Sequence, residues 1–258
     1  MNEQIIRALR DLEREQGVRV LLAVESGSRA WGFASPDSDY DVRFIYVHPR
    51  DWYVSVLEAR DVVERMLPGD LDVSGWDLRK TLRLFAKCNL ALNEWLSSPL
   101  TYLENSEFRK ELASLVPRYF NAIAGVYHYR KMALSAFVDN YRDGVIGIKK
   151  IFYVLRPLLA CRWIEHVSSQ PPTEFNHLVA ADWVSPEERQ WIGALLEQKA
   201  LAMEAATIAL EASRASKISS ELERYEAIAS ALPAPPKLAL DDLNELLRRW
   251  TASWRLPL

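Results

Sequence analysis

Residues 25–41, with the sequence ESGSRAWGFASPDSDYD, connect two apolar stretches of the 258-residue chain. The stretches, residues 18–24 and 40–47, are short and rich in β-branched side chains, a pattern typical of buried strands. A Gly-Ser dipeptide follows the first stretch, and ten residues separate it from an Asp-x-Asp motif. Glycine lets backbone amides approach an anion closely because it carries no side chain. The segment therefore predicts a strand, a turn able to bind an anion, and a second strand that begins with carboxylates.

The two carboxylates of the motif belong to Asp39 and Asp41. Strand alternation projects both side chains to one side, about 7 Å apart along the chain. Paired carboxylate oxygens are hard ligands of the kind that Mg²⁺ prefers together with substrate phosphate. The pattern predicts a magnesium site beside the turn.

A third carboxylate is expected from a neighbouring strand. Asp72 stands between apolar residues at the beginning of a strand pattern over residues 71–76. Asp77 is the alternative, although it directly precedes a helical pattern and has the position of an N-cap. We favour Asp72 and keep Asp77 as the second candidate.

Hydrophobic periodicity predicts the elements around this motif. Apolar residues at helical spacing predict an opening helix over residues 2–16, and a further strand pattern covers residues 61–67. From about residue 90 onward only helical patterns recur. The candidate helices there cover residues 91–96, 107–115, 119–139, 145–167, 186–212 and 238–254, with a proline-rich connector at residues 233–236. An N-terminal α+β part is therefore expected to join a helical part near residues 98–105.

The composition excludes several classes of protein. The 32 basic and 35 acidic side chains give a net charge of −3, and 49% of the residues are hydrophobic, which excludes a disordered or strongly basic chain. No stretch approaches the roughly 20 apolar residues that span a bilayer, and the first residues do not read as a signal peptide. Cys88 and Cys161 lie in apolar helical patterns, so we expect no zinc site or disulfide. We expect a soluble, cytoplasmic protein with no membrane partner.

Basic residues concentrate in one stretch of the helical part. Residues 127–162 carry seven basic and two acidic side chains, a net +5. Lys149 and Arg156 are seven residues apart and so share a helix face. They could bind a triphosphate, since arginine offers a bidentate grip and lysine a point charge. A solvated helix face is the alternative. Arg29 lies close to the motif, and Arg43 follows Asp41 by two, so Arg43 is expected to point to the same side and contact a phosphate or an acceptor.

The order Gly27-Ser28, Asp39-Tyr-Asp41 and Asp72 resembles the nucleotidyltransferase superfamily of DNA polymerase β. More narrowly, GSRAWGFASPDSDYDVRFIYV at residues 27–47 and DLRKTLRLF at residues 77–85 are similar to the RNA-ligase-associated, YcgL-type nucleotidyltransferases of bacteria and phages. KKIFYVLRPLLACRW at residues 149–163 resembles the helical half of that family. One departure is the absence of a proline between Asn89 and Glu94, where the family often has Asn-Pro before a glutamate.

The resemblance implies a fold and a site. The expected fold class is α+β, with a polymerase-β-like catalytic core, a small mixed sheet with helices, at residues 1–100. An all-helical domain at residues 101–258 would close the cleft for nucleotide and acceptor. Two Mg²⁺ ions, or Mn²⁺ in their place, would be held by Asp39 and Asp41, with Asp72 binding only the ion that activates the attacking hydroxyl. Ser28 and the amides around Gly27 would hold the β and γ phosphates of a nucleoside triphosphate.

The activity implied by the resemblance is transfer of a nucleoside monophosphate, with ATP as the expected donor, to an acceptor hydroxyl. The association of the family with RNA ligases favours an RNA end, such as that of a tRNA, in repair or end modification. One alternative keeps the chemistry but has a protein, as in AMPylation, or a small molecule as acceptor. The other is a nucleotide-sensing module without catalysis.

Overall fold

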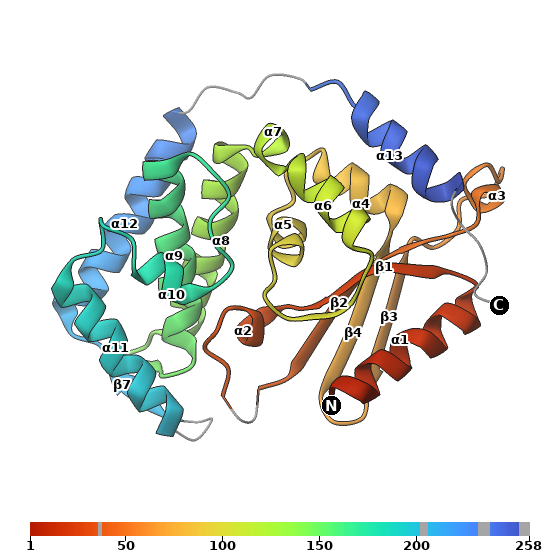
Figure 1. Ribbon diagram of the computed structural model, residues 1–258. Coiled ribbons are helices and arrows are strands. Elements are labelled where there is room, and N and C mark those ends of the chain that lie inside the picture. Colours follow the sequence, from red (N-terminus) through yellow and green to blue (C-terminus); the bar gives the residue numbers. More distant parts are fainter. Residues whose placement is uncertain (36–37, 202–205, 232–237, 253–258) are drawn as a thin grey trace. The chain divides into compact units, whose positions relative to one another are not determined.

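The computed structural model describes residues 1–35, 38–201, 206–231 and 238–252, and the chain divides into two compact units (Figure 1). Unit 1 consists of residues 1–119 together with the C-terminal segment from residue 237, and unit 2 consists of residues 120–236. The predicted connector at residues 233–236 lies outside the described residues, as do parts of the helices predicted over residues 186–212 and 238–254.

Unit 1 contains, within the described residues, a five-stranded mixed sheet in the order β3-β4-β2-β1-β5. The strands are β1 (Arg19–Glu25), β2 (Tyr40–Val47), β3 (Val62–Leu67), β4 (Leu71–Asp77) and β5 (Thr101–Glu104). β2 runs parallel to β4, whereas β1 pairs antiparallel with β2 and β5, and β3 with β4. The four strands predicted before residue 77 are confirmed. The parallel register sets Asp41 opposite Asp72, so the motif of β2 meets the candidate acid of β4.

Helices cover both faces of this sheet because the side chains of the strands alternate between two apolar clusters. On β2, Val42 and Phe44 belong to one cluster and Ile45 and Val47 to the other. The first cluster is completed by α1 (Asn2–Gln16), the predicted opening helix. The second contains residues of α4 (Leu78–Phe85), α5 (Leu90–Leu96), α6 (Ser106–Ser114), α7 (Val116–Tyr119) and α13 (Asp241–Ala252). Two further short helices are α2 (Gly27–Ala30) and α3 (Arg50–Tyr53).

The predicted domain boundary at residue 100 differs from this division. β5 adds an edge strand to the sheet by pairing with β1, and α6 and α7 pack on the same core. α13 also belongs to unit 1, where Leu243, Leu246 and Trp250 join the core. A strand of four residues and a helix distant in sequence give no local signal of the unit to which they belong.

Unit 2 is mainly helical. Its helices are α8 (Ala122–Asn140), α9 (Lys150–Val167), α10 (Phe175–Val179), α11 (Pro186–Leu201) and α12 (Ala212–Ala231). The expectation of an all-helical domain is wrong in one detail, because β6 (Val145–Gly147) pairs antiparallel with β7 (Thr207–Ala209). Three residues are too few to show strand alternation, and the sequence pattern therefore predicts helices over both segments. Of the helices described, none combines the length and the apolar character that a bilayer span requires.

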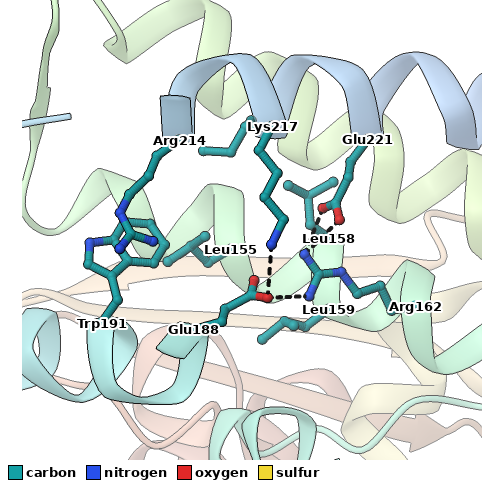
Figure 2. Close-up of a pocket in the computed structure, with 10 residues that line it drawn as sticks. Leu155, Leu158, Leu159, Arg162, Glu188, Trp191, Arg214, Lys217 and Glu221 are labelled. Atoms are coloured by element: carbon teal, nitrogen blue, oxygen red, sulfur yellow. Dashed lines mark hydrogen bonds and ion pairs between the residues drawn. The ribbon is translucent and has the colours of Figure 1, made fainter. Parts of the chain in front are cut away.

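A small cavity lies among α9, α11 and α12 of unit 2 (Figure 2). It is bordered by apolar side chains of α9, such as Leu155, and by the Trp191 ring, over which the guanidinium carbon of Arg214 lies 4.2 Å from the ring centroid. Its volume of about 30 Å³ admits a water molecule but no nucleotide. This cavity is therefore not a candidate for the predicted triphosphate site.

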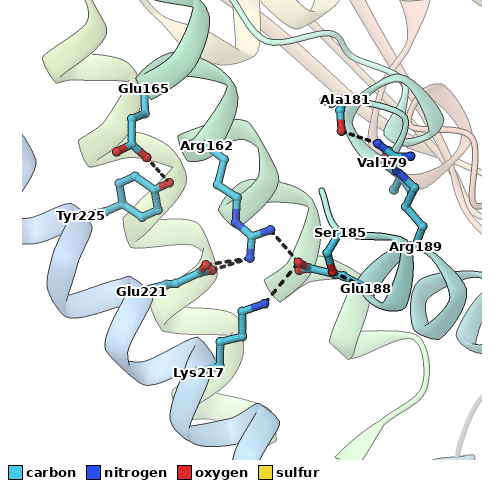
Figure 3. Close-up of polar contacts among 10 residues, drawn as sticks. All are labelled: Arg162, Glu165, Val179, Ala181, Ser185, Glu188, Arg189, Lys217, Glu221 and Tyr225. Carbon is cyan, nitrogen blue, oxygen red and sulfur yellow. Dashed lines mark hydrogen bonds and ion pairs between the residues drawn. The ribbon is translucent and has the colours of Figure 1, made fainter. Parts of the chain in front are cut away.

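Charged side chains join the same three helices (Figure 3). Arg162 on α9 donates hydrogen bonds to Glu188 on α11 at 2.9 Å and to both carboxylate oxygens of Glu221 on α12 at 2.7 and 2.9 Å. Lys217 on α12 donates to Glu188 at 3.2 Å. Burial disfavours the charge on Arg162, but the bonds to the two glutamates raise its pKa overall. Ion pairs thus supplement apolar packing inside unit 2.

Candidate functional site

The Gly-Ser turn forms the start of α2, and one residue, Ser26, separates it from the end of β1. Gly27 has a φ of +60°, in the left-handed region that favours glycine. A Cβ at this position would lie 2.2 Å from Oδ2 of Asp41, far closer than two such atoms can approach. The backbone N–H of Ser26 donates to the carbonyl of Asp41 at 2.8 Å. The glycine is therefore required for the turn to lie directly against the carboxylate of β2.

The three predicted carboxylates border one cavity in unit 1. Asp39, Asp41 and Asp72 line a space of about 160 Å³ together with Met66 and Asp70. Asp70 is a fourth acid that the sequence reasoning missed. Its only signal is its place directly after the Pro-Gly turn that joins β3 to β4, and it has a positive φ of 53°. The cavity therefore concentrates negative charge at the start of the two parallel strands.

Arg43 lies between two of these acids. Its Nη2 donates to Oδ1 of Asp41 at 3.0 Å and to Oδ2 of Asp72 at 2.8 Å, and its Nη1 donates to the carbonyl of Asp72 at 3.2 Å. The side chain points to the same side of the sheet as Asp41, as its spacing predicts. Its partners here are carboxylates, whereas we expected a phosphate or an acceptor. Arg43 therefore acts as a counter-ion within the acidic cavity.

The surroundings of Asp41 disfavour its negative charge. Burial raises the pKa of Asp41, and the charges of Asp72 and Asp39 raise it further, whereas the guanidinium of Arg43 opposes them. A carboxylate in such surroundings gains from a bound cation, which removes both the repulsion and part of the cost of burial. The electrostatics of the cavity therefore favour a cation.

The donor set suits a divalent ion of the magnesium type. Three carboxylates around one cavity supply the oxygen ligands that Mg²⁺ and Mn²⁺ accept. In the described part of the chain no three or more His, Cys, Asp or Glu side chains are placed so that they could hold a metal ion together, and Arg43 joins two of the candidate ligands. The residues thus fit the ion by chemistry and by strand position, while their side chains are arranged around an arginine.

Asp77, the alternative third acid, serves as an N-cap. Its Oδ1 accepts the backbone N–H of Arg79 at 2.8 Å at the start of α4, and its Oδ2 accepts the hydroxyl of Tyr53 at 2.5 Å. The residue is fully buried and ends β4, whereas Asp72 stands near the start of that strand. Asp72 stays our candidate for the third carboxylate.

Arg29 holds the segment that leads to Asp39. Its Nε donates to the carbonyl of Asp39 at 3.0 Å and its Nη2 to the carbonyl of Ser38 at 2.6 Å. Its guanidinium carbon lies 3.8 Å from the centroid of the Tyr40 ring. These contacts give Arg29 a structural role. The contacts of Arg29 and Ser28 with a nucleotide stay predictions.

The two basic residues predicted from the helical half lie in unit 2. Lys149 is the N-cap residue of α9, and its contact with a triphosphate stays a prediction. Arg156 is only 1% exposed, and its Nε and Nη2 donate to the carbonyl of Thr173 at 3.3 and 3.1 Å. The prediction was that Arg156 shares a helix face with Lys149 and binds a triphosphate, but the guanidinium is buried and bonded to the backbone. We therefore remove Arg156 from the proposed phosphate contacts.

The basic stretch at residues 127–162 is compensated in part by acids from elsewhere in unit 2. Arg130 pairs with Glu226, and Arg162 pairs with Glu188 and Glu221. The net +5 counted along the sequence therefore overstates the positive charge that this stretch offers to a partner.

Two buried glutamates hold the turn and were not identified as site residues. Glu25 accepts the backbone N–H of Asp41 at 2.8 Å. Glu94 on α5 accepts the indole N–H of Trp31, which follows the Gly-Ser turn, at 3.0 Å. Asn89 caps α5 through the backbone N–H of Leu92 at 3.0 Å, so this helix begins without the missing proline. The only sequence signal for Glu25 is an acid at the end of an otherwise apolar strand.

Comparison with known proteins assigns the chain to a family. The family model described as the RNA repair pathway DNA polymerase beta family, or RlaP, matches residues 1–249. The chain belongs to this family. A relative described as the uncharacterized protein YcgL of Bacillus subtilis strain 168 is 44% identical over 247 residues, which cover 96% of this chain and 95% of that protein.

A solved structure also matches over most of the chain. It is the crystal structure of a nucleotidyltransferase-like protein from Exiguobacterium sibiricum 255-15, with 14% identity and a TM-score of 0.31, covering 88% of this chain and 75% of that one. Membership in the RlaP family confirms the resemblance stated from the motifs. The predicted α+β fold class, with a small mixed sheet and a helical region after it, is confirmed by the architecture. The description of the family links it to DNA polymerase β and to RNA repair.

Proposed function

We propose that this protein transfers a nucleoside monophosphate, with ATP as donor, to a hydroxyl at the end of an RNA. The observation that carries the proposal is the register of β2 and β4, which sets Asp41 opposite Asp72 beside the glycine turn. Carboxylates on adjacent strands beside a glycine turn suit metal-assisted phosphoryl transfer, because they can hold cations next to backbone amides that could bind phosphate. The RNA acceptor follows from the description of the family and its link to RNA repair.

Each residue of the site has a proposed role. Asp39 and Asp41 would hold two Mg²⁺ or Mn²⁺ ions, and Asp72 would bind one of them on the acceptor side. When bound, these ions supply neutralisation of the triphosphate and a lower pKa for the attacking hydroxyl. Gly27 and Ser28 would contact the β and γ phosphates through the turn. Arg43 can exchange a carboxylate for a phosphate oxygen, because a guanidinium binds both in the same bidentate manner.

The proposed reaction is a displacement at the α phosphorus. A new bond forms between the acceptor oxygen and the α phosphorus, and the bond from this phosphorus to the oxygen that bridges to the β phosphate breaks. Pyrophosphate leaves with that bridging oxygen, and the proton of the acceptor hydroxyl passes to solvent. The protein contributes mainly positions and charges, as is usual for phosphoryl transfer.

Labelling with α-labelled nucleotides tests the proposal. The purified protein is incubated with Mg²⁺, each of the four labelled triphosphates in turn, total RNA and a protein extract, and the products are separated. We expect label in RNA, most strongly from ATP, and none with the Asp39→Asn/Asp41→Asn variant. Binding to RNA should weaken steeply with salt because the phosphate backbone supplies most of the affinity.

The fate of the label separates the competing functions. Label in polypeptide would identify protein AMPylation instead, and label in a small molecule would identify a resistance-like activity. A protein that binds nucleotide but labels nothing would act as a nucleotide sensor. Equal labelling by the wild type and the double variant would exclude these carboxylates from the reaction.

A further inference from the structure

Glu25 is a fully buried acid at the end of β1, two residues before Gly27. Its backbone is fixed by a neighbouring segment: its N–H donates to the carbonyl of Leu100 at 2.9 Å, and its carbonyl accepts the hydroxyl of Ser98 at 2.7 Å. A carboxylate in such a place is costly, since an apolar side chain could fill the same space without losing hydration. Its contacts therefore require an explanation.

Both oxygens of the Glu25 carboxylate have hydrogen-bond partners in the site region. Oε1 accepts the backbone N–H of Asp41 at 2.8 Å, and Oε2 accepts the hydroxyl of Tyr102 on β5. The carbonyl of Asp41 also accepts a hydrogen bond from the N–H of Ser26 at 2.8 Å. The N–H and the carbonyl of Asp41 are thus both held by residues at the end of β1.

The reason for this arrangement lies in the sheet. β1 and β2 are paired as far as Glu25 and Val42, after which the chain turns away at Gly27. The N–H of Asp41 therefore lies beyond the last regular pair of the two strands and has no backbone acceptor on β1. The side chain of Glu25 accepts its hydrogen bond instead. Hydrogen bonds to a charged acceptor are stronger than those between neutral groups.

We propose that Glu25, supported by Tyr102, is a positioning residue that fixes the backbone of Asp41 so that its carboxylate faces the cavity shared with Asp39 and Asp72. This inference rests on the proposed metal-dependent transfer. Groups that orient a metal ligand from behind typically change metal affinity by about 10- to 100-fold when they are removed.

Metal affinity measured by calorimetric titration with Mn²⁺ tests the inference. Glu25→Ala removes the acceptor and should weaken Mn²⁺ binding by about 10- to 100-fold. Glu25→Gln keeps an oxygen for the Asp41 N–H and should stay within a few-fold of the wild type. Tyr102→Phe removes the support from behind and should lie between the two. If Glu25→Ala does not fold, Glu25→Met has a similar volume to glutamate without an acceptor and takes its place.

Glu13 offers a matched control in the same unit. It is a glutamate of α1 with 4% exposure, and its Oε1 accepts the backbone N–H of Val20 near the other end of β1 at 2.8 Å. Glu13→Ala therefore removes an equivalent buried bond to a strand amide, at a position away from the cavity. We expect this variant to lose stability while its Mn²⁺ affinity stays at the wild-type value.

Amide hydrogen exchange followed by NMR gives a second measurement that needs no metal. Glu25→Ala should accelerate exchange at the amide of Asp41, and Glu13→Ala should do so at that of Val20. Wild-type Mn²⁺ affinity in Glu25→Ala, alongside its loss in Asp41→Asn, would overturn the positioning role, as would unchanged exchange at Asp41.

The failure of the proposed function has a different signature. In that case the wild type binds no Mn²⁺ and labels no acceptor, and Asp41→Asn is indistinguishable from it. The exchange experiment still reports whether Glu25 holds the backbone of Asp41.

Discussion

Gly27 shows how one missing side chain shapes the site. Its φ of +60° and the 2.2 Å that would separate a Cβ from Oδ2 of Asp41 make any other residue costly at this position. The N–H of Ser26 and the carboxylate of Glu25 hold the same aspartate through its backbone. The side chain and the backbone of Asp41 are thus each constrained by the few residues at the end of β1.

Replacement of Gly27 by alanine should impair the site far more than it impairs the fold. The new methyl group would displace the carboxylate of Asp41, and a misplacement of about 1 Å can lower a rate about 100-fold. Gly17→Ala is the matched control, because Gly17 has the same φ of +60° with nothing within 4 Å of its would-be Cβ. Both variants should lose about 1–2 kcal/mol of stability through backbone strain, measured by urea unfolding. Equal transfer rates in the two variants would contradict the prediction.

We expect the stability of unit 1 to depend on pH through His48. Burial lowers the pKa of His48 from 6.5 to about 4, and its ring stacks on Trp52 with 4.1 Å between centroids. The unfolded chain therefore binds a proton at higher pH than the folded chain does. The contribution of His48 to stability is complete above about pH 6.5 and is lost as the pH falls toward 4.

Melting temperatures at a series of pH values check this prediction. The wild type should lose stability between pH 6.5 and 4, and His48→Phe, which keeps a stacked ring without a titrating group, should lose less over the same interval. Parallel curves for the two proteins would show that other groups cause the loss.

At the scale of elements, the sequence predicts those that carry their own pattern. α1 shows helical periodicity, and the first four strands have six to eight residues each, enough to show a strand pattern. Asp77 was predicted as an N-cap and is one in the structure. β5, β6 and β7 have three or four residues and become strands only through pairing with partners far along the chain. The local sequence pattern is sufficient to predict α1 and the first four strands, but it does not indicate β5, β6 or β7.

The candidate site divides in the same way. Asp39, Asp41 and Asp72 were identified because their order and spacing can be read along the chain. The burial of Arg156 was not foreseen because the spacing of Lys149 and Arg156 shows only that they share a helix face, and most residues of α9 around Arg156 are buried. Glu25 was missed because its role depends on the N–H of a residue 16 positions away.

The pairing of β2 with β4 leads to a prediction about packing. Gly75 lies opposite Phe44 in the register, and a Cβ there would lie 2.3 Å from the phenyl ring. Gly75→Ala should therefore destabilise the protein by about 1–3 kcal/mol through overpacking, measured by urea unfolding. Gly193→Ala on α11 is the contrasting change, because its Cβ would meet nothing within 4 Å, and it should stabilise by up to about 1 kcal/mol. A loss in both variants would contradict this account.

On the scale of the whole molecule, the positions of the charged side chains in the structure matter more than their total. The chain has a net charge of −3, yet its acids and bases are placed where they compensate one another. Arg43 lies among the carboxylates of unit 1, and Arg162 lies between two glutamates in unit 2. Neither the total nor a run of basic residues along the sequence measures what a nucleotide or an RNA would meet.

The Arg162 network should contribute strongly to the stability of unit 2. Arg162 is 12% exposed and Glu188 is 10% exposed, so Arg162→Ala leaves two poorly hydrated carboxylates without their main partner. We expect a loss of about 3–5 kcal/mol in the free energy of unfolding. Arg224→Ala, which removes a more exposed pair with Glu165, should cost at most about 1 kcal/mol. A loss below 1 kcal/mol in Arg162→Ala would show that the network adds little.

The packing of α13 on the core of unit 1 has a consequence for synthesis on the ribosome. Residues 1–119 emerge first, but the core that contains Leu82 and Phe108 also needs Leu243, Leu246 and Trp250, which are translated only after all of unit 2. A nascent chain therefore exposes part of that apolar core throughout the time taken to make more than a hundred further residues, a period in which chaperones can bind it. The core of unit 1, which carries the acidic cavity, is therefore completed only after unit 2 has been synthesised.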